Sequence, residues 1–265
     1  MPPIMIEACE KKNITPFIVG FKGQTDPDIV KGHYHLWTRL GTAGQVIQTL
    51  KSHDIRDIVM IGSIRRPSLD ELRPDWQTAK LLARMGFRVL GDDGILKALR
   101  SELEKKGFEI CAIQDYVSDI LTKAGTYGNI APGKQHQKDI KKGIDIAREL
   151  GKLDIGQACV IQNGLVLGVE AIEGTDALIQ RCGALKRKGK GPVLVKVSKP
   201  GQDENIDLPT IGPQTIENAA SQGFSGIGAE AGKSLMIKAD TCTLEADKAG
   251  IFLHGVEVDE NDPKL

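Results

Sequence analysis

The chain has 265 residues, of which 40% are hydrophobic and 26% charged, and this composition excludes an intrinsically disordered or collagen-like protein. Lys and Arg together number 35, as do Asp and Glu, so the formal net charge is zero. A general nucleic-acid-binding protein carries a basic excess, and we therefore expect no nucleic-acid partner. The short basic cluster at residues 186–190 is interpreted as a solvated loop.

Neither a secretory signal nor a membrane-spanning helix is predicted. The first ten residues lack a basic region followed by an apolar stretch, and no window of about 18 uncharged apolar residues occurs. The five cysteines are odd in number, widely spaced and without a CxxC pair, which is typical of free thiols in a reducing compartment. We expect a cytoplasmic protein, and peripheral contact with a bilayer stays open.

The first half of the chain alternates helices with short apolar strands. Helices are predicted at 3–13, 42–53, 75–85 and 94–106, and strands at 15–21, 58–61, 87–90 and 108–113. The strand at 58–61 (IVMI) is wholly apolar, as expected for a parallel sheet covered on both faces. This order predicts a Rossmann-like, doubly wound α/β domain over residues 1–122.

The second half of the chain follows a linker expected at residues 123–137, and its predicted strands and helices do not alternate regularly. The linker segment lacks periodicity and is rich in glycine. Strands are predicted at 158–161, 165–172, 193–197, 226–230, 235–237 and 251–253, and helices at 139–150, 175–182, 213–222 and, as a short turn, 245–249. Asn163-Gly164 is a hairpin signal. We expect a mixed α+β domain over residues 138–265.

Polar residues are densest in residues 170–182 and 193–213. In the first segment, Thr175 is expected to cap the helix that follows it. The amino terminus of that helix also offers N–H groups and a favourable dipole to a phosphate, and both roles are compatible.

The second segment places Lys196 and Lys199 at the end of a strand, followed by Gln202, Asp203 and Asp207 in a loop. One interpretation is a surface loop of solvated charges. The other is a phosphate-ester or phosphoanhydride site, in which lysines hold phosphate and carboxylates hold a divalent cation such as Mg²⁺ or position a water.

A third candidate follows the strand at 58–61, at Gly62 and Ser63, where α/β folds bind ligands. Arg66 could clamp a phosphate there, or it could pair with Asp70.

Longer strings of the sequence carry a resemblance. They are RPDW (73–76), LDIGQA (153–158), VLGVEAIEGTDALI (166–179), VLVKVSKPGQD (193–203), DLPTIGPQTI (207–216), GIGAEAGKSL (226–235) and GIFLHG (250–255). In these strings the chain resembles the LpxI-type UDP-2,3-diacylglucosamine pyrophosphatases from Pro2 to Gly255.

The resemblance implies an activity and its setting. Such enzymes of lipid A biosynthesis in Gram-negative bacteria hydrolyse UDP-2,3-diacylglucosamine with Mg²⁺ to UMP and 2,3-diacylglucosamine 1-phosphate (lipid X). Water attacks the α-phosphorus. The resemblance further implies a Rossmann-like domain followed by a lipid-product-binding and catalytic domain, a cytoplasmic homodimer, and peripheral contact with the inner membrane.

Site residues follow from the matching motifs. Asp207, in DLPTIG, is expected to be catalytic, by binding Mg²⁺ or by orienting the water, and Asp203 is a second catalytic candidate. Asp176 is a second metal-ligand candidate. Substrate contacts are expected from the EGTD turn, the KxxKPxQ stretch and the GxxxRP loop, which here supply Glu173, Gly174, Thr175, Asp176, Lys196, Lys199, Gln202, Gly62, Ser63 and Arg66.

The start of the chain departs from the family pattern, because members begin with a strand and a glycine-rich segment that this sequence is expected to lack. An alternative function is therefore a non-catalytic lipid or nucleotide-sugar binding protein. Another is a nucleotide-sugar enzyme of different chemistry. Release of UMP, release of UDP, or binding without turnover distinguishes the three.

Overall fold

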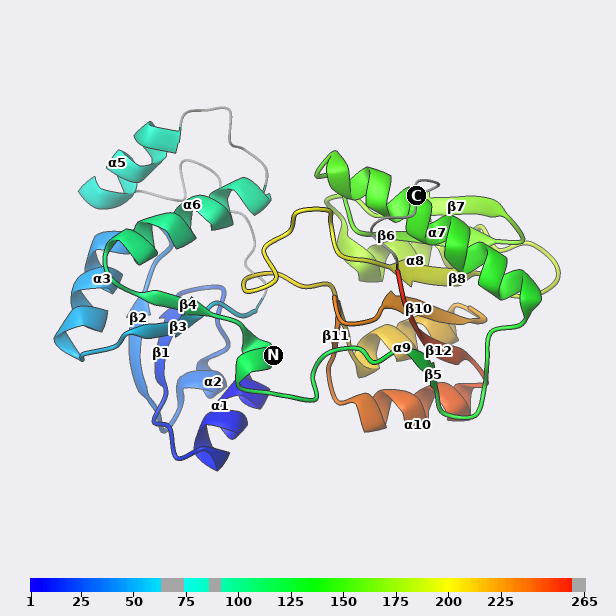
Figure 1. Cartoon of the computed structure of the whole chain (residues 1–265), viewed down its shortest axis with the longest axis horizontal. Helices are drawn as coiled ribbons and strands as arrows, with labels where there is room; N and C mark the ends of the chain where they lie inside the picture. The colour runs from blue at the N-terminus through cyan, green and yellow to red at the C-terminus, as the bar shows by residue number, and fades with distance from the viewer. Residues whose placement is uncertain (63–73, 86–91, 259–265) are drawn as a thin grey trace. The chain divides into compact units, whose positions relative to one another are not determined.

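A computed structural model describes residues 1–62, 74–85 and 92–258 (Figure 1). The chain divides into two compact units. Unit 1 comprises Met1–Val117 with Asn205–Asp207, and unit 2 comprises Ser118–Glu204 with Leu208–Leu265. The strand predicted at 87–90 lies outside the described residues.

Unit 1 is a mixture of helices and short parallel strand pairs. Its elements are α1 (Pro2–Lys11), β1 (Phe17–Phe21), α2 (Pro27–Val30), β2 (Tyr34–Thr38), α3 (Ala43–Ser52), β3 (Asp57–Val59), α5 (Trp76–Met85), α6 (Asp92–Lys105), β4 (Glu109–Cys111) and a 3₁₀ turn at Ile113–Asp115. β1 pairs with β2 and β3 pairs with β4, both in parallel. Among the described residues these pairs form two separate two-stranded sheets.

Sequence patterning missed α2 and β2. Helix α2 is only four residues long, and its N-cap is Asp26, whose side chain accepts a hydrogen bond from the Asp28 N–H at 3.0 Å. Strand β2 (YHLWT) is exposed over its first two residues, so it lacks the apolar run that marks a buried strand.

The core of unit 1 lies between α3, α6 and the β3–β4 pair. Ile47 and Leu50 of α3, spaced i and i+3 on one face of the helix, pack with Leu103, Phe108 and Ile110. Ile206, from the 205–207 segment, packs against the same cluster.

Unit 2 is built on one six-stranded sheet in the order β5-β12-β10-β8-β6-β7. Its strands are β5 (Gly125–Tyr127), β6 (Ala158–Gln162), β7 (Leu165–Val169), β8 (Val193–Lys196), β10 (Gly226–Glu230) and β12 (Phe252–Val256). Strands β8, β10 and β12 run parallel, whereas β5 and β6 run against them. Two short strands, β9 (Thr210–Ile211) and β11 (Leu235–Met236), form a separate parallel pair.

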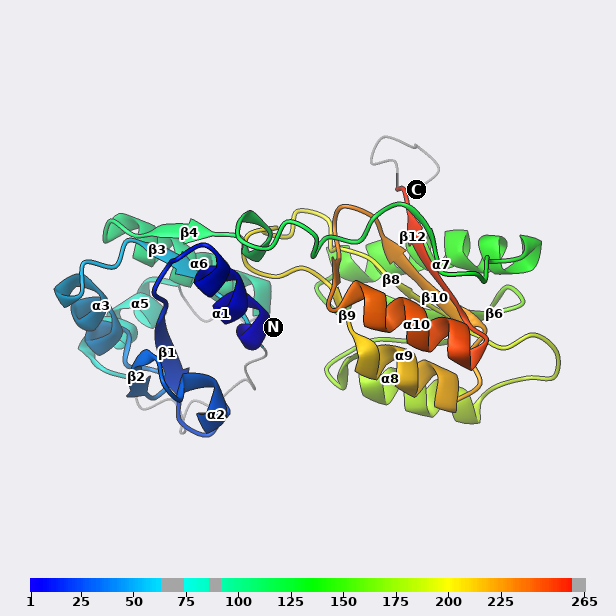
Figure 2. The ribbon, with the colours of Figure 1, turned by 90° about the horizontal axis from the view of Figure 1, so that it is seen from below.

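Helices cover both faces of this sheet (Figure 2). Helix α7 (Lys134–Lys152) packs on one face through Ile140, Ile144 and Ala147. The opposite face is covered by α8 (Gly174–Ala184), α9 (Pro213–Ser221) and α10 (Ala239–Ala249). Alternate residues of β6 and β8 enter the two cores, as the pleat of a strand buried on both faces requires.

Helix α7 approaches the sheet closely at Gly143. A Cβ atom at that position would lie 2.5 Å from a methyl carbon of Val195, so only glycine fits without a shift of the neighbouring strand. Residues 123–137, predicted to be a linker, contain β5 and the first residues of α7, and both belong to unit 2.

The hairpin predicted at Asn163-Gly164 is confirmed. These two residues join the antiparallel β6 and β7, and both have positive φ angles, 51° and 78°. The five cysteines are free, as predicted, and four of them are buried. Burial raises the pKa of Cys159 to about 12 and that of Cys242 to about 11, which keeps both thiols protonated. No helix among the described residues is both long enough and apolar enough to cross a bilayer.

Candidate active site

Charged residues gather where the strands of unit 2 end. Strands β7, β8 and β10 run in the same direction, so their carboxyl ends lie at one edge of the sheet, and β6 begins there. Glu170 follows β7, and Lys196 and Glu230 are the last residues of β8 and β10. All three are buried, with exposed fractions of 6%, 7% and 3%. Open α/β sheets bind ligands at such a carboxyl edge.

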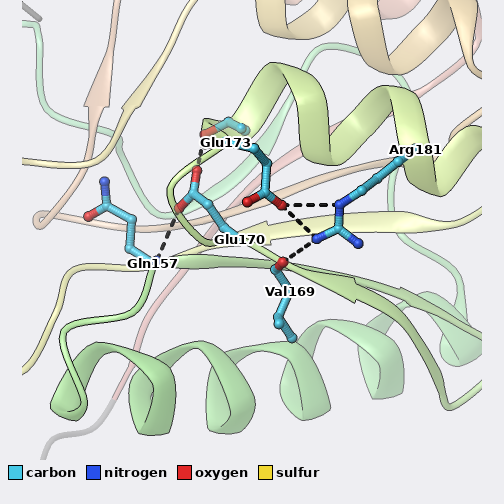
Figure 3. A network of polar contacts seen from close by, with 6 residues as sticks. Gln157, Val169, Glu170, Glu173 and Arg181 are labelled. Atoms are coloured by element: carbon cyan, nitrogen blue, oxygen red, sulfur yellow. Dashed lines mark hydrogen bonds and ion pairs between the residues drawn. The ribbon is translucent and has the colours of Figure 1, made fainter. Parts of the chain in front are cut away.

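A hydroxyl group connects two of these charges. Thr175 Oγ1 donates to Glu170 Oε1 at 2.6 Å and accepts from Lys196 Nζ at 2.9 Å. The second carboxylate oxygen of Glu170 accepts from the Gln157 N–H at 3.0 Å (Figure 3). Lys196 Nζ also donates to the Thr210 carbonyl at 3.1 Å. The ammonium and the carboxylate are therefore held in fixed geometry around Thr175.

Helix α8 begins differently from the prediction. Its N-cap residue is Glu173, whose side chain makes no capping hydrogen bond. The expectation that Thr175 caps the helix is wrong, because its hydroxyl is already engaged with Glu170 and Lys196. Gly174, the first helical residue, has a φ of +78°, a conformation that favours glycine.

Glu173 turns away from this network toward Arg181 of the same helix. Its Oε1 accepts hydrogen bonds from Arg181 Nε at 3.1 Å and from Nη2 at 2.7 Å, and Arg181 also donates to the Val169 carbonyl (Figure 3). The pKa of Glu173 is lowered by its own backbone N–H and then by the Arg181 guanidinium. Asp176, one turn on, is exposed and accepts from Asn218 Nδ2 at 2.9 Å.

The loop after β8 holds a second set of polar contacts. Gln202 Oε1 accepts from Ser198 Oγ at 3.1 Å and from the Lys199 N–H at 2.9 Å. The Ser198 N–H donates to Glu230 Oε2 at 2.8 Å, which links this loop to the end of β10. Lys199 Nζ forms an ion pair with Asp154 Oδ1 at 2.6 Å. Of the two predicted lysines, Lys196 is thus buried and Lys199 is paired near the surface.

The two candidate catalytic aspartates lie farther along the same loop. Asp203 is half-buried in unit 2. Asp207 is exposed and belongs to the 205–207 segment grouped with unit 1. Within residues 1–62, 74–85 and 92–258, no three His, Cys, Asp or Glu side chains lie close enough together to hold a metal ion.

Gly62 follows β3 in unit 1, and its φ of +99° requires glycine. Ser63 and Arg66, the other residues predicted there, lie outside the described residues.

Sequence reasoning missed Glu170, Glu230, Ser198 and Asp154. For Glu170 and Glu230 a signal was present, since each carboxylate directly ends an apolar strand run. A charge in that position is costly to bury unless it is paired, so it indicates a place where the fold must supply hydrogen-bond partners. Ser198 and Asp154 gave no such signal, because Ser198 is linked to Glu230 and Asp154 to Lys199, and both partners are far away in the sequence.

Comparison with known proteins covers nearly the whole chain. Residues 1–120 match the LpxI N-terminal domain and residues 123–254 match the LpxI C-terminal domain. The chain belongs to the LpxI family. It is 37% identical over 228 residues to the UDP-2,3-diacylglucosamine pyrophosphatase LpxI of Caulobacter vibrioides, an alignment that spans 83% of this chain and 81% of that protein. The resemblance inferred from the sequence strings is thereby confirmed.

The LpxI C-terminal domain contains the buried polar residues at the carboxyl ends of β7, β8 and β10. Glu170, Thr175, Lys196 and Glu230 all fall within residues 123–254. The candidate site of this LpxI family member therefore lies in the domain that bears the long shared strings.

Proposed function

We propose that the chain hydrolyses the pyrophosphate bond of UDP-2,3-diacylglucosamine, releasing UMP and 2,3-diacylglucosamine 1-phosphate for lipid A biosynthesis. The observation that carries this proposal is the 37% identity to a UDP-2,3-diacylglucosamine pyrophosphatase across 83% of the chain. The chemistry of the strand edge supports it, since pyrophosphate hydrolysis requires charge neutralisation on phosphoryl oxygens and a positioned water.

Lys196 is the residue best suited to neutralise phosphate charge. Its ammonium is buried, where an electrostatic interaction is stronger than in water, and it is oriented by Thr175 Oγ1 and the Thr210 carbonyl. The first turn of α8, at Gly174 to Asp176, adds a helix amino terminus without a side-chain cap. We assign the diphosphate of the substrate to these groups, and we assign additional contacts to the pyrophosphate or glucosamine to Lys199 and Gln202. A contact to the nucleotide or sugar is assigned to Gly62.

Asp207 is assigned the role of positioning the attacking water, either directly or through Mg²⁺. Mg²⁺ in phosphoryl-transfer sites is held by one or two carboxylates together with substrate phosphates, so a preassembled cluster of ligands is not required. Asp207, with Asp176 as second candidate, has the oxygen donors that this cation prefers. Mg²⁺, when bound, would neutralise charge on the phosphates and lower the pKa of a bound water.

The remaining parts of the proposal concern architecture and setting. The two parallel strand pairs of unit 1, which alternate with helices, are compatible with a Rossmann-like nucleotide domain. We further propose a cytoplasmic homodimer that contacts the inner membrane peripherally to reach its diacylated substrate.

The test is hydrolysis of UDP-2,3-diacylglucosamine by the purified chain with Mg²⁺ in ¹⁸O-labelled water. Attack at the α-phosphorus places ¹⁸O in UMP and leaves the lipid phosphate unlabelled. Release of UDP would instead indicate cleavage at the sugar, and label in the lipid product would indicate attack at the other phosphorus. Binding of the substrate with no turnover would contradict the proposed activity.

A matched variant distinguishes hydrolysis by this chain from hydrolysis by a contaminating enzyme. Asp207→Asn keeps the size of the side chain and removes the carboxylate, so UMP release should fall at least 1,000-fold while the variant keeps its circular dichroism spectrum. UMP release at the wild-type rate by this variant would remove Asp207 from the mechanism.

A further inference from the structure

A basic surface occupies the edge of unit 2 opposite the candidate active site. At that edge β6 ends, β7 begins, and the segment 185–192 leads into β8. We define the basic surface by three residues of this segment and three of helix α7: Arg187, Lys188, Lys190, Lys134, Lys138 and Lys141. All six are exposed.

The basic segment is anchored rather than free in solvent. Gln162, which is 1% exposed, donates from Nε2 to the carbonyls of Arg187 at 2.9 Å and Lys190 at 2.7 Å. Its Oε1 accepts from the Arg187 N–H at 2.8 Å. One buried amide therefore fixes the backbone of the segment and leaves the cationic side chains outward, which a merely solvated loop does not need.

Helix α7 is bound to the same hairpin. Asp139, which is 1% exposed, accepts from the Asn163 and Gly164 N–H groups at 2.9 Å and 2.7 Å. Lys142 Nζ donates to the Gly164 carbonyl at 2.7 Å. A Cβ atom built on Gly133 would lie 3.5 Å from Lys190 Nζ, so the segment and the start of α7 are neighbours.

The lysines of α7 lie on one side of the helix. Lys134, Lys138 and Lys141 are spaced i, i+4, i+7, so they share one exposed face of the helix, whereas Ile140 and Ile144 enter the core. Residues 134–142 contain four lysines, and their one acidic side chain, Asp139, is buried. Residues 185–192 contain four basic residues and none that is acidic. This local excess stands out in a chain of zero net charge.

Apolar side chains flank these charges. Leu185, next to the basic segment, is 53% exposed, and Leu165, next to Gly164, is 47% exposed. Neither residues 134–142 nor residues 185–192 contain Phe, Tyr or Trp, and the ring of His136 packs on Phe252. Single-stranded nucleic acid is held by aromatic stacking as well as charge, whereas an anionic bilayer is held by lysines together with inserted aliphatic residues.

We propose that this basic surface docks unit 2 on an anionic lipid bilayer. The choice of a bilayer rests on the proposed function, because a diacylated substrate resides in a membrane. The surface lies at the edge of the sheet away from the candidate active site, so docking and hydrolysis use different residues and are separable by mutation.

The experiment measures binding of the purified full chain to substrate-free vesicles by co-sedimentation. Vesicles of phosphatidylcholine with 30% phosphatidylglycerol should retain the protein, and pure phosphatidylcholine should not. Two triple variants remove the charge: Arg187→Gln with Lys188→Gln and Lys190→Gln, and Lys134→Gln with Lys138→Gln and Lys141→Gln. Each should lower the partition coefficient at least tenfold, and 0.5 M NaCl should do the same to the wild type.

A control variant matches the change in charge. Lys22→Gln, Lys31→Gln and Lys51→Gln remove three exposed lysines of unit 1 and should leave the partition coefficient within twofold. Equal loss in the control, vesicle binding by both surface variants at the wild-type level, or no anionic binding by the wild type would overturn the proposal. Preferential binding of a single-stranded RNA in competition with the vesicles would replace the bilayer by a nucleic acid.

Hydrolysis in detergent micelles distinguishes this proposal from the proposed function. Both triple variants should release UMP from micellar substrate at the wild-type rate, because no residue of the basic surface is assigned to the site. Vesicle binding without any hydrolysis would contradict the proposed activity and still support the docking surface.

Discussion

Lys196 Nζ and Thr175 Oγ1 lie 2.9 Å apart, although the two residues come from β8 and α8 and are 21 positions apart in the chain. The same hydroxyl donates to Glu170. A buried ammonium and a buried carboxylate are thereby joined through one neutral group: the ammonium donates to the hydroxyl and the hydroxyl donates to the carboxylate.

Removal of that hydroxyl should impair catalysis. Thr175→Val preserves the shape of the side chain but leaves Lys196 and Glu170 without their shared partner. Since a hydrogen bond to a charged group contributes about 1.5–3 kcal/mol, kcat should fall roughly 10- to 100-fold. Steady-state hydrolysis of UDP-2,3-diacylglucosamine measures this effect.

Thr175→Ser is the matched control, because it keeps the hydroxyl and deletes one methyl group. Its kcat should stay within about threefold of the wild type, well under the 1.4 kcal/mol that corresponds to a factor of ten. If the serine and valine variants lose the same activity, the packing of the methyl group matters and the hydrogen bonds do not.

The two loop aspartates should respond differently to Mg²⁺. If Asp207 holds the cation, a conservative Asp207→Glu variant should require a higher Mg²⁺ concentration for half-maximal rate, and Asp203→Glu should not. Chelation of Mg²⁺ from the wild type should abolish UMP release, and added Mg²⁺ should restore it. A rate that is insensitive to chelation would exclude Mg²⁺ from the mechanism.

Asp139 should be a major determinant of the stability of unit 2. Its buried carboxylate accepts hydrogen bonds from Gln135 Nε2 and from the Asn163 and Gly164 N–H groups. Asp139→Ala should lower the free energy of unfolding by roughly 1.5–3 kcal/mol, because the hydrogen bonds to this buried charged acceptor are lost. Urea denaturation followed by circular dichroism measures the change.

Asp119→Ala provides the comparison. Asp119 is 84% exposed and pairs only at the surface with Lys123, at 3.3 Å, so its removal should leave the urea midpoint nearly unchanged. Equal destabilisation by both variants would mean that the hairpin contacts of Asp139 contribute nothing specific.

Stability should also fall in mildly acidic solution because of His136. Its ring packs on Phe252 with a centroid separation of 5.2 Å, and both ring nitrogens are buried without a hydrogen-bond partner among the described residues. Burial, and then the charge of Lys190, lower the pKa of His136 below its ordinary value of 6.5. The unfolded chain therefore binds the proton more readily.

The contribution of neutral His136 is complete above pH 6.5 and is lost as the pH falls toward the lowered pKa of the folded state. We expect a smaller free energy of unfolding at pH 5 than at pH 7, and a smaller difference in His136→Phe, which cannot titrate. A residual slope in that variant is expected from His254, whose pKa burial also lowers. An unchanged slope would show that His136 does not titrate in this range.

Local patterns in the sequence were sufficient for many elements of unit 2. Strand β10 occupies the predicted residues 226–230, and the Asn-Gly pair forms the predicted hairpin. These features depend on side-chain alternation and on the φ angles that a residue tolerates, which are properties of neighbours in the chain. The predicted turn at 245–249 was too short, since α10 begins at Ala239.

Strand order and the pairing of charges were decided only by tertiary structure. Sequence motifs pointed to Thr175 and Lys196, but Glu170 became a partner only because β7 and β8 end at the same edge of the sheet. The charge pattern at 186–190 predicts a solvated loop, whereas in the fold Gln162 holds the backbone of this segment at Arg187 and Lys190. Buried polar groups must find hydrogen-bond partners wherever the fold places them, and those partners are often far away in the sequence. The sequence by itself therefore determined the family, the strands and the residues that carry charge, whereas the folded chain decided which of those charges meet.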